Sequence, residues 1–556
     1  MQTKRLRAQA VRDQVDQRIA KLEIAIRALK THRNTVANTS PLPPEILSNI
    51  FTIVRTVIRV EFWWKPTWAQ VAHVCRHWRA VALACPALWS DLMFFSRGPT
   101  FTEMMLQRSK NAPLTVKLYG YPSFDDILCK IASQTSRLRD VELRRATSTT
   151  PFDLSKILSS FESKAPILEK LVLKGPELYG KTGSDRYHTM PANFLQDGAP
   201  SLQHLDITQI AIHWDALPIS TTLTHLQLEN VVPENRPTRK SFSETLSKLL
   251  RLETMKLSAF LPHSGASQPK SLPVILPSLR TLELKDFAAE LRQFFSMTRM
   301  PQEARVDVEL SDVTLESESL ESLFSALRAS WTLPKDVLAD AARNLAQPNI
   351  LDLRVIDYMP RRKPRIMYWL NNHDLPPNFE FENPPANLIM SAPSVLEIDI
   401  TLLFKVITGH LNTSSLRSLK ISSNQVGLTK NVLELVKDLT KLDKIAIWKS
   451  HDALSEFLEI LRDHALAFPS LRSIELYDID FDEELTGYPD TAIRALAAAL
   501  KSWKKFRPTI DRFAMTECIN FVEEHWEVLR AALPKEVEMY WDESEYIVDP
   551  SEDEED

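Results

Sequence analysis

The sequence predicts an α/β protein in which a few helices precede a long array of short strands alternating with further helices. Two observations carry this prediction. The pattern apolar-x-x-apolar-x-apolar returns many times after about residue 136. Glycine is scarce, at 10 of 556 residues, against roughly 7% in an average protein. Nucleotide-binding loops need glycine for close backbone approach to phosphate, and neither GxGxxG nor GxxxxGK[ST] occurs, so a nucleotide enzyme is not expected.

The bulk composition narrows the class of protein. A chain of 556 residues is too long for one ordinary core, and 44% hydrophobic with 25% charged residues is typical of a folded soluble protein. The net charge of -5 favours neither nucleic acid nor membrane as the main partner. The four cysteines form no CxxC pair, which predicts a reducing compartment, cytoplasmic or nuclear, and no structural zinc. The basic, polar N-terminus predicts no secretory signal.

Residues 1–38 predict an amphipathic helix. Its apolar residues alternate spacings of four and three, which makes a narrow seam of 3.5-residue period. The seam consists of Val15, Ile19, Leu22, Ile26 and Leu29. A single helix lying on the rest of the protein and a self-pairing coiled coil both satisfy this pattern, and the sequence leaves both open.

Residues 40–97 predict a small helical module. Ser40 is the expected cap of a helix that starts in a proline-rich turn and carries an apolar face. A second helical run is expected from Trp68 to Ala84, stopped by Pro86, before a last apolar cluster around Trp89. The apolar residues of the whole module are too few to form the core of a self-sufficient domain.

Residues 98–540 predict a repeat array. Consecutive clear copies of the six-residue pattern begin 21 to 34 residues apart, with helix-like runs between them. The copies begin at Leu138, Leu168, Leu202, Leu223, Leu252, Leu279, Val395, Leu416, Leu442 and Leu471, with looser ones at Ile350 and Ile510. A short strand and a helix repeated at this period is the signature of a leucine-rich-repeat solenoid, with one curved parallel sheet. The repeats are faint between residues 286 and 393, and an acidic disordered tail is expected over 541–556.

The strands of such an array predict a binding surface. Alternation sends the residues beside the last two apolar positions to the concave side of the sheet. These are Asp140, Glu142, Lys170, Lys174, Asp206, Gln227, Lys256, Glu283, Lys285, Glu397, Asp399, Lys420, Lys444, Trp448, Glu475 and Tyr477. Mixed charge argues against a nucleic-acid backbone, and a long wall suits a protein client. The expected client-binding residues are Lys256, Glu283, Lys420, Trp448, Glu475 and Tyr477.

The sequence offers little for catalysis. His73, Cys75 and His77 lie close together, but on a helix Cys75 points away from the two histidines and no fourth ligand is near. Neither HExxH nor GxSxG occurs, and Cys129 and Cys518 lack an adjacent base. We therefore expect a non-enzymatic protein with no cofactor and no metal.

The module resembles an F-box. Residues 42–51 read LPPEILSNIF, residues 74–82 read VCRHWRAVA and residues 86–89 read PALW. The whole chain resembles the F-box proteins of mushroom-forming fungi, which put a short coiled-coil helix before the box and degenerate leucine-rich repeats after it. The stretch from Thr52 to Thr67 is longer and more aromatic than the family pattern.

This resemblance implies a three-helix box that docks onto a Skp-type adaptor, and through it onto a cullin. By matched position it implies an adaptor-binding set of Leu42, Pro43, Ile46, Leu47, Ile50, Phe51, Val74, Cys75 and Trp78. The expected function is substrate recruitment for a ubiquitin ligase, with the repeats holding the client. The alternative is a non-catalytic repeat scaffold whose box packs intramolecularly, without a ligase role. An enzyme would require a metal at His73 and His77 or a deep glycine-lined cleft.

Overall fold

The protein is described by a computed structural model that covers the chain in segments. These are residues 2–36, 42–61, 67–94, 99–119, 125–144, 154–161, 164–175, 188–195, 198–229, 232, 235–265, 272–312, 316–333, 352–357, 365–369, 387–392, 400–410, 413–423, 431–464, 466–481, 492–504 and 510–544. The chain divides into two compact units. Unit 1 comprises residues 1–212 and 216–220, and unit 2 comprises residues 213–215 and 221–556.

Unit 1 begins with helices, as the sequence predicts. They are α1 (Gln2–Thr35), α2 (Pro44–Glu61), the 3₁₀ helix η1 (Thr67–His73), α3 (Arg76–Ala84) and the 3₁₀ helix η2 (Pro86–Trp89). The single helical run predicted from Trp68 to Ala84 is wrong, because the chain breaks between η1 and α3. Cys75 is extended there, with φ -155°, and its Sγ accepts a hydrogen bond from the Trp78 N–H at 3.4 Å, which caps α3. The predicted cap Ser40 lies outside the described residues.

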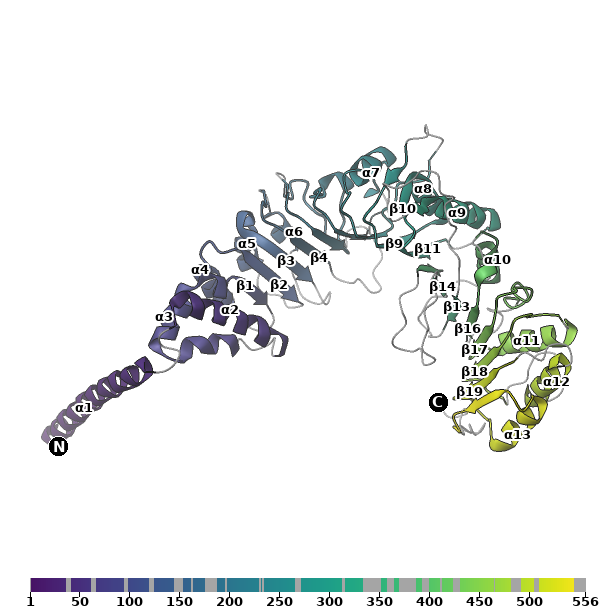
Figure 1. Ribbon diagram of the computed structural model, residues 1–556. Helices are drawn as coiled ribbons and strands as arrows, with labels where there is room; N and C mark the ends of the chain where they lie inside the picture. Colours follow the sequence, from purple (N-terminus) through teal and green to yellow (C-terminus); the bar gives the residue numbers. More distant parts are fainter. Residues whose placement is uncertain are drawn as a thin grey trace. The chain divides into compact units, whose positions relative to one another are not determined.

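A parallel sheet follows in unit 1, with α4 (Pro99–Arg108), α5 (Asp125–Ala132) and α6 (Leu154–Leu158) on one face of it (Figure 1). Its strands pair in chain order: β1 (Asp91–Phe94), β2 (Leu114–Tyr119), β3 (Leu138–Arg144), β4 (Lys170–Lys174) and β5 (His204–Thr208). The sequence did not reveal β1 and β2. Because β1 pairs with β2, the sheet starts inside the range assigned to the helical module.

Unit 2 holds a longer sheet. Its first four strands pair in parallel and in chain order: β6 (His225–Glu229), β7 (Thr254–Ser258), β9 (Thr281–Asp286) and β11 (Arg305–Leu310). Its last five do the same: β16 (Ser418–Ser423), β17 (Lys444–Trp448), β18 (Ser473–Tyr477), β19 (Arg512–Thr516) and β20 (Glu538–Trp541).

The middle of unit 2 corrects the prediction of an all-parallel sheet. β13 (Asp352–Asp357), β14 (Arg365–Trp369) and β15 (Leu388–Ser391) form an antiparallel meander. The meander enters the sheet in reverse order, with β15 beside β11 and β13 beside β16. The strand predicted at Val395 lies mostly outside the described residues, and its last residue, Ile400, instead begins a helix.

The helices of unit 2 are α7 (Arg239–Leu246), α8 (Ala288–Met297), α9 (Ser317–Ser330), α10 (Ile400–His410), α11 (His451–Asp463), α12 (Ala492–Lys504) and α13 (Glu523–Ala532). In Figure 1, α11 to α13 lie on the same face of β17 to β19. A second, small parallel sheet joins β8 (Val274–Ile275), β10 (Thr298–Pro301) and β12 (Trp331–Leu333). The face of each large sheet opposite its helices is called the open face below.

Apart from the copy at Val395, the recurring apolar triplets of the described segments contribute buried strands to the core, as predicted. In β4 and β17, for example, Leu171, Leu173, Ile445 and Ile447 are all 0% exposed. After several strands the next residue adopts a positive φ, as Lys449 does at 50°. Its N–H then bonds the Tyr477 carbonyl of the following strand at 3.1 Å, which holds neighbouring repeats together.

The C-terminal boundary also differs from prediction. Trp541 belongs to β20, and its ring packs against Phe521 at 5.4 Å and against Trp526 at 5.9 Å. The Asp542 carboxylate accepts a hydrogen bond from the Glu517 N–H at 2.7 Å. The array therefore includes the first residues assigned to the acidic tail, whose remainder from residue 545 lies outside the described residues.

Candidate protein-binding surfaces

Helix α2 has one buried face. Leu47 and Phe51 are both 0% exposed, and the Phe51 ring lies 5.1 Å from the half-buried ring of Trp78 on α3. These three side chains hold α2 against the rest of the module. Within the predicted adaptor-binding set, Leu47 and Phe51 are thus interior residues, so any contact with a partner has to come from their exposed neighbours.

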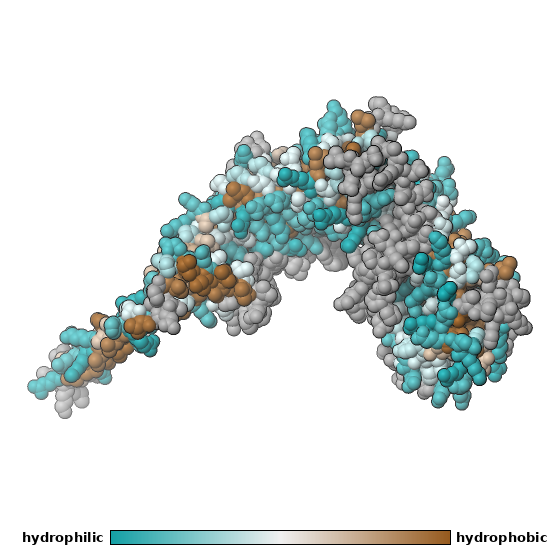
Figure 2. Space-filling model, viewed as in Figure 1, coloured by the Kyte–Doolittle hydropathy of each residue, from teal (hydrophilic) through white to brown (hydrophobic). Residues whose placement is uncertain are grey.

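A second face of α2, beside the buried one, carries an exposed apolar row. Its side chains recur at spacings of four, three and four, which places them on one stripe of a helix. The stripe consists of Ile46 (45% exposed), Ile50 (37%), Ile53 (62%) and Val57 (60%), and is called the α2 stripe. Figure 2 shows hydrophobic residues gathered over α2. An exposed apolar cluster on a folded module is the usual mark of a docking surface.

The remaining residues of the predicted set lie beside this helix. Val74, at the break between η1 and α3, is 59% exposed. Pro43 is exposed and Leu42 half-buried, and the Pro43 carbonyl accepts the Leu47 N–H at 3.1 Å, which starts α2. Cys75 is half-buried and caps α3. The exposed members of the predicted set are thus Pro43, Ile46, Ile50 and Val74.

Arg55 joins the module to the sheet, and sequence reasoning missed it. It lies on α2 but is only 7% exposed, and its guanidinium donates to the carbonyls of Leu88 and Asp91. Its Nη2 is 3.7 Å from the Asp91 carboxylate, and its Cζ is 4.7 Å from the centre of the Trp68 ring. Of the segment taken as an insertion, Thr52 to Glu61 thus continues α2, and Arg55 within it anchors the helix to η2 and β1. Residues 62–66 lie outside the described residues.

The open face of unit 1 carries a charged network. Glu142 is 4% exposed and contacts three cations: Arg144 at 2.7 Å, Lys170 at 3.5 Å and Lys117 at 3.7 Å. Lys117 also lies 3.8 Å from Asp140. Burial raises the pKa of the Asp140 carboxyl above its ordinary value, against the opposing effect of Lys117 and Lys170. The predicted outward residues Asp140, Glu142 and Lys170 therefore lie in one charged network, which Lys117 and Arg144, not predicted from the sequence, complete.

The first half of unit 2 pairs its open-face charges in the same way. Lys256 and Glu283 are neighbours in the register of β7 and β9, and their charged atoms lie 2.6 Å apart. Their side chains are 37% and 40% exposed. Because the two charges already neutralise each other, such a pair contributes more to specificity than to affinity in a protein interface.

The second half contains an aromatic stack. The rings of Trp448 and Tyr477 lie 4.0 Å apart at 19°, and the Lys420 ammonium sits 3.0 Å from the centre of the Trp448 ring. Both faces of Trp448 are therefore covered, and it is 8% exposed. Tyr477 is half-buried, and its hydroxyl donates to Glu517. Of the two predicted aromatic anchors, Tyr477 is the accessible one.

Glu475 sits beside this stack on β18, where its carboxylate lies 2.8 Å from the Lys444 ammonium. Glu397 and Asp399, predicted on the same face, lie outside the described residues. The accessible part of this half is therefore a tyrosine edge next to a paired carboxylate, a combination that suits a polar peptide surface.

The residues considered for chemistry are not arranged for it. His73 and His77 lie on different elements, η1 and α3, so they do not share one helix face. No group of three or more metal-ligating side chains occurs in the described segments. Burial raises the pKa of the Cys518 thiol to about 12, so it remains protonated at neutral pH and is a poor nucleophile.

One buried carboxylate has a structural role. Glu456 on α11 is 8% exposed, and its Oε1 accepts the Glu434 N–H at 2.8 Å. Burial raises the pKa of this carboxyl to about 7, although backbone hydrogen bonds oppose the change. This hydrogen bond fastens the turn at residues 431–438 to α11.

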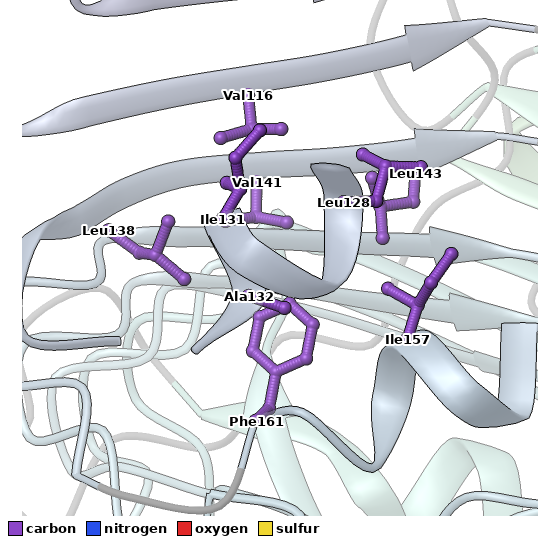
Figure 3. Close-up of a pocket in the computed structure, with 9 residues that line it drawn as sticks. All are labelled: Val116, Leu128, Ile131, Ala132, Leu138, Val141, Leu143, Ile157 and Phe161. Atoms are coloured by element: carbon purple, nitrogen blue, oxygen red, sulfur yellow. The ribbon is translucent and has the colours of Figure 1, made fainter. Parts of the chain in front are cut away.

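A cavity in unit 1 is too small for a metabolite. It lies between β2, β3 and helices α5 and α6, and its volume is about 10 Å³ (Figure 3). All nine lining side chains are apolar: Val116, Leu128, Ile131, Ala132, Leu138, Val141, Leu143, Ile157 and Phe161. Such a space holds at most about one water and offers it no hydrogen bond.

Two further findings concern the chain as a whole. None of the helices in its described part has the length and apolar character needed to cross a bilayer. No protein-family model matches the sequence, and the comparison with curated proteins finds no relative.

Proposed function

We propose that this chain is a substrate-recruiting subunit of a Skp/cullin/F-box ubiquitin ligase. In this proposal the helical module around α2 is an F-box that binds a Skp-type adaptor, and the strand–helix array is a leucine-rich-repeat solenoid that binds a protein client. The observation that carries it is the α2 stripe, because it is exposed and two of its residues belong to the motif that resembles an F-box.

The physics of the α2 stripe supports docking into a groove. A helix that places apolar side chains at spacings of three and four is recognised by an apolar groove on its partner. Each such side chain contributes roughly 1.5–3 kcal/mol when fully buried. Ile50 and Ile53 lie at the centre of the stripe, and central residues carry most of the binding energy in protein interfaces.

The buried residues of the module hold α2 in place, so that the α2 stripe stays exposed. Phe51 and Trp78 pack together behind the stripe, and Arg55 ties the helix to η2 and β1. The same contacts are what a repeat scaffold with an intramolecular box would need. The α2 stripe supports the ligase subunit over the scaffold, because an uncovered apolar row has no role in a box that packs only intramolecularly.

The client surface is assigned to the open faces of the two units. Their side chains carry both signs of charge and are paired with one another, as Lys256 is with Glu283. Such a surface fits a folded protein or a polar peptide better than a polyanion. Tyr477 and Glu475 are the residues from which we expect the strongest contribution in unit 2.

A binding measurement with a purified Skp-type adaptor tests the proposal. We expect direct binding, and we expect Ile50→Asp with Ile53→Asp to weaken it by at least about tenfold, because even one lost apolar anchor is worth about that factor. Both side chains are exposed, so the fold should survive, which circular dichroism checks. The matched control is Leu250→Asp, which replaces an exposed leucine of unit 2.

The outcomes separate the two functions. Loss of binding in the α2 variant with full binding in the Leu250→Asp control supports the ligase subunit. No binding of the wild-type chain, or equal binding by all three proteins, contradicts it and favours the scaffold.

A further inference from the structure

The N-terminal helix exposes its whole apolar seam. Every residue of α1 from Arg7 to Arg33 is exposed, so no described part of the chain covers it. The seam residues are Val15 (51% exposed), Ile19 (48%), Leu22 (58%), Ile26 (50%) and Leu29 (70%). Figure 2 shows hydrophobic residues following α1 along its length. A lone helix gains nothing from such a row, whereas a paired helix buries it.

The order of isoleucine and leucine in the seam indicates how many helices pair and in which orientation. Ile19 and Ile26 take heptad position a, and Leu22 and Leu29 take position d. Isoleucine at a with leucine at d packs best in a parallel two-stranded coiled coil, because the β-branched side chain fits that layer. The next a positions outward are Arg12 and Arg33, whose charges limit the apolar core to residues 15–29.

Charge complementarity favours the same arrangement. In a parallel pair, position g of one helix meets position e of the next heptad on the other, which brings Arg18 to Glu23 of the second copy on both sides. Antiparallel pairs that keep four apolar layers bring acidic residues together instead, either Asp16 and Glu23 or two copies of Glu23. Glu23 already bonds Arg27 on its own helix at 2.9 Å, and it remains 56% exposed for a second partner.

We propose that the occupant of this seam is a second copy of the same chain, so that α1 forms a parallel two-stranded coiled coil over residues 15–29. This inference is independent of the proposed function, since it uses no residue of the module or the array. Its consequence is a dimer with two α2 stripes and two client faces, in which the second contact with a multivalent partner becomes intramolecular.

Sedimentation of the full-length chain over a wide range of concentrations tests the pairing. We expect the molar mass to rise from 63.6 kDa toward twice that value. Ile19→Lys with Ile26→Lys should weaken dimerisation at least about tenfold, because it places charges in two core layers. The matched control is Ile24→Lys on the same helix, which is 64% exposed and lies outside the seam, and which should dimerise like the wild type.

A charge exchange tests the orientation. Arg18→Glu and Glu23→Arg should each weaken self-association, and an equimolar mixture of the two variants should recover the wild-type dimer as a heterodimer. A chain that stays monomeric, a trimer, a dimer unaffected by the lysine variants, or a mixture without recovery overturns the proposal. Adaptor binding is a separate measurement, so failure here leaves the test of the proposed function intact.

Discussion

Arg55→Met tests whether Arg55 anchors helix α2 to η2 and β1. The substitution keeps a long apolar stem but removes a guanidinium that is 7% exposed and donates to the Leu88 and Asp91 carbonyls. A hydrogen bond from a charged group contributes roughly 1.5–3 kcal/mol, and breaking one partner of a buried ion pair costs roughly 3–5 kcal/mol. We therefore expect the module to lose about 3–5 kcal/mol of local stability.

Hydrogen–deuterium exchange resolves this effect by segment. A loss of about 3 kcal/mol or more corresponds to at least about a hundredfold faster exchange in α2, η2 and β1, while the amides of unit 2 serve as an internal reference. The matched control is Arg27→Met on α1. The Arg27 side chain is 59% exposed, and within the described residues its guanidinium bonds the exposed carboxylate of Glu23. The effect of this substitution should be below about 1 kcal/mol. If the Arg55 variant exchanges like this control, Arg55 is not the anchor.

Two further predictions concern the array. In Gly175→Ala the new Cβ would lie 2.1 Å from the Gln209 carbonyl oxygen, whereas a Cβ at Gly409 in α10 meets nothing within 4 Å. Denaturation should show that Gly175→Ala lowers the free energy of unfolding by about 1–3 kcal/mol and that Gly409→Ala raises it by up to about 1 kcal/mol. Equal effects of the two substitutions would contradict the close approach of Gly175 to Gln209. Burial raises the pKa of Glu456 from 4.5 to about 7, so the folded state binds this proton more tightly than the unfolded state. The protonated Glu456 carboxyl therefore contributes on the order of 3 kcal/mol to the free energy of unfolding. This contribution is complete below pH 4.5 and is lost as the pH rises through 7. Glu456→Gln should flatten this dependence in unfolding measured at pH 5 and pH 8, and an unchanged slope would refute the assignment.

The repeat strands were predictable because each carries its own signal. In β3, for instance, Val141 and Leu143 recur at the spacing of two that places both on one face of a strand. Both are buried, and so is Leu138, the first residue of the pattern. In the meander of β13 to β15, only β13 carried such a signal, as the looser copy of the pattern that begins at Ile350. The antiparallel order of the meander depends on which edges of β11 and β16 remain available, and these are set by the rest of the sheet.

For the residues predicted to bind a partner, the sequence likewise indicated some features and missed others. The motif identified Ile46, Leu47, Ile50 and Phe51 as apolar helix positions, but their spacing cannot say which face is covered by neighbours. Packing against Trp78 buries Phe51 and leaves Ile50 exposed. Likewise, Trp448 and Tyr477 fall at equivalent strand positions. Trp448 is the buried one because Tyr477 covers one face of its ring and Lys420 covers the other.

What the sequence determined by itself are the features encoded within a few residues: the helical seam of α1, the short apolar strands and the order of the module before the array. Periodicity reports these because side-chain direction follows from local backbone geometry. The tertiary structure alone decided where Arg55 binds, how the meander is inserted and which charges pair across strands. These contacts join residues tens of positions apart, so they depend on which neighbours the completed fold brings together.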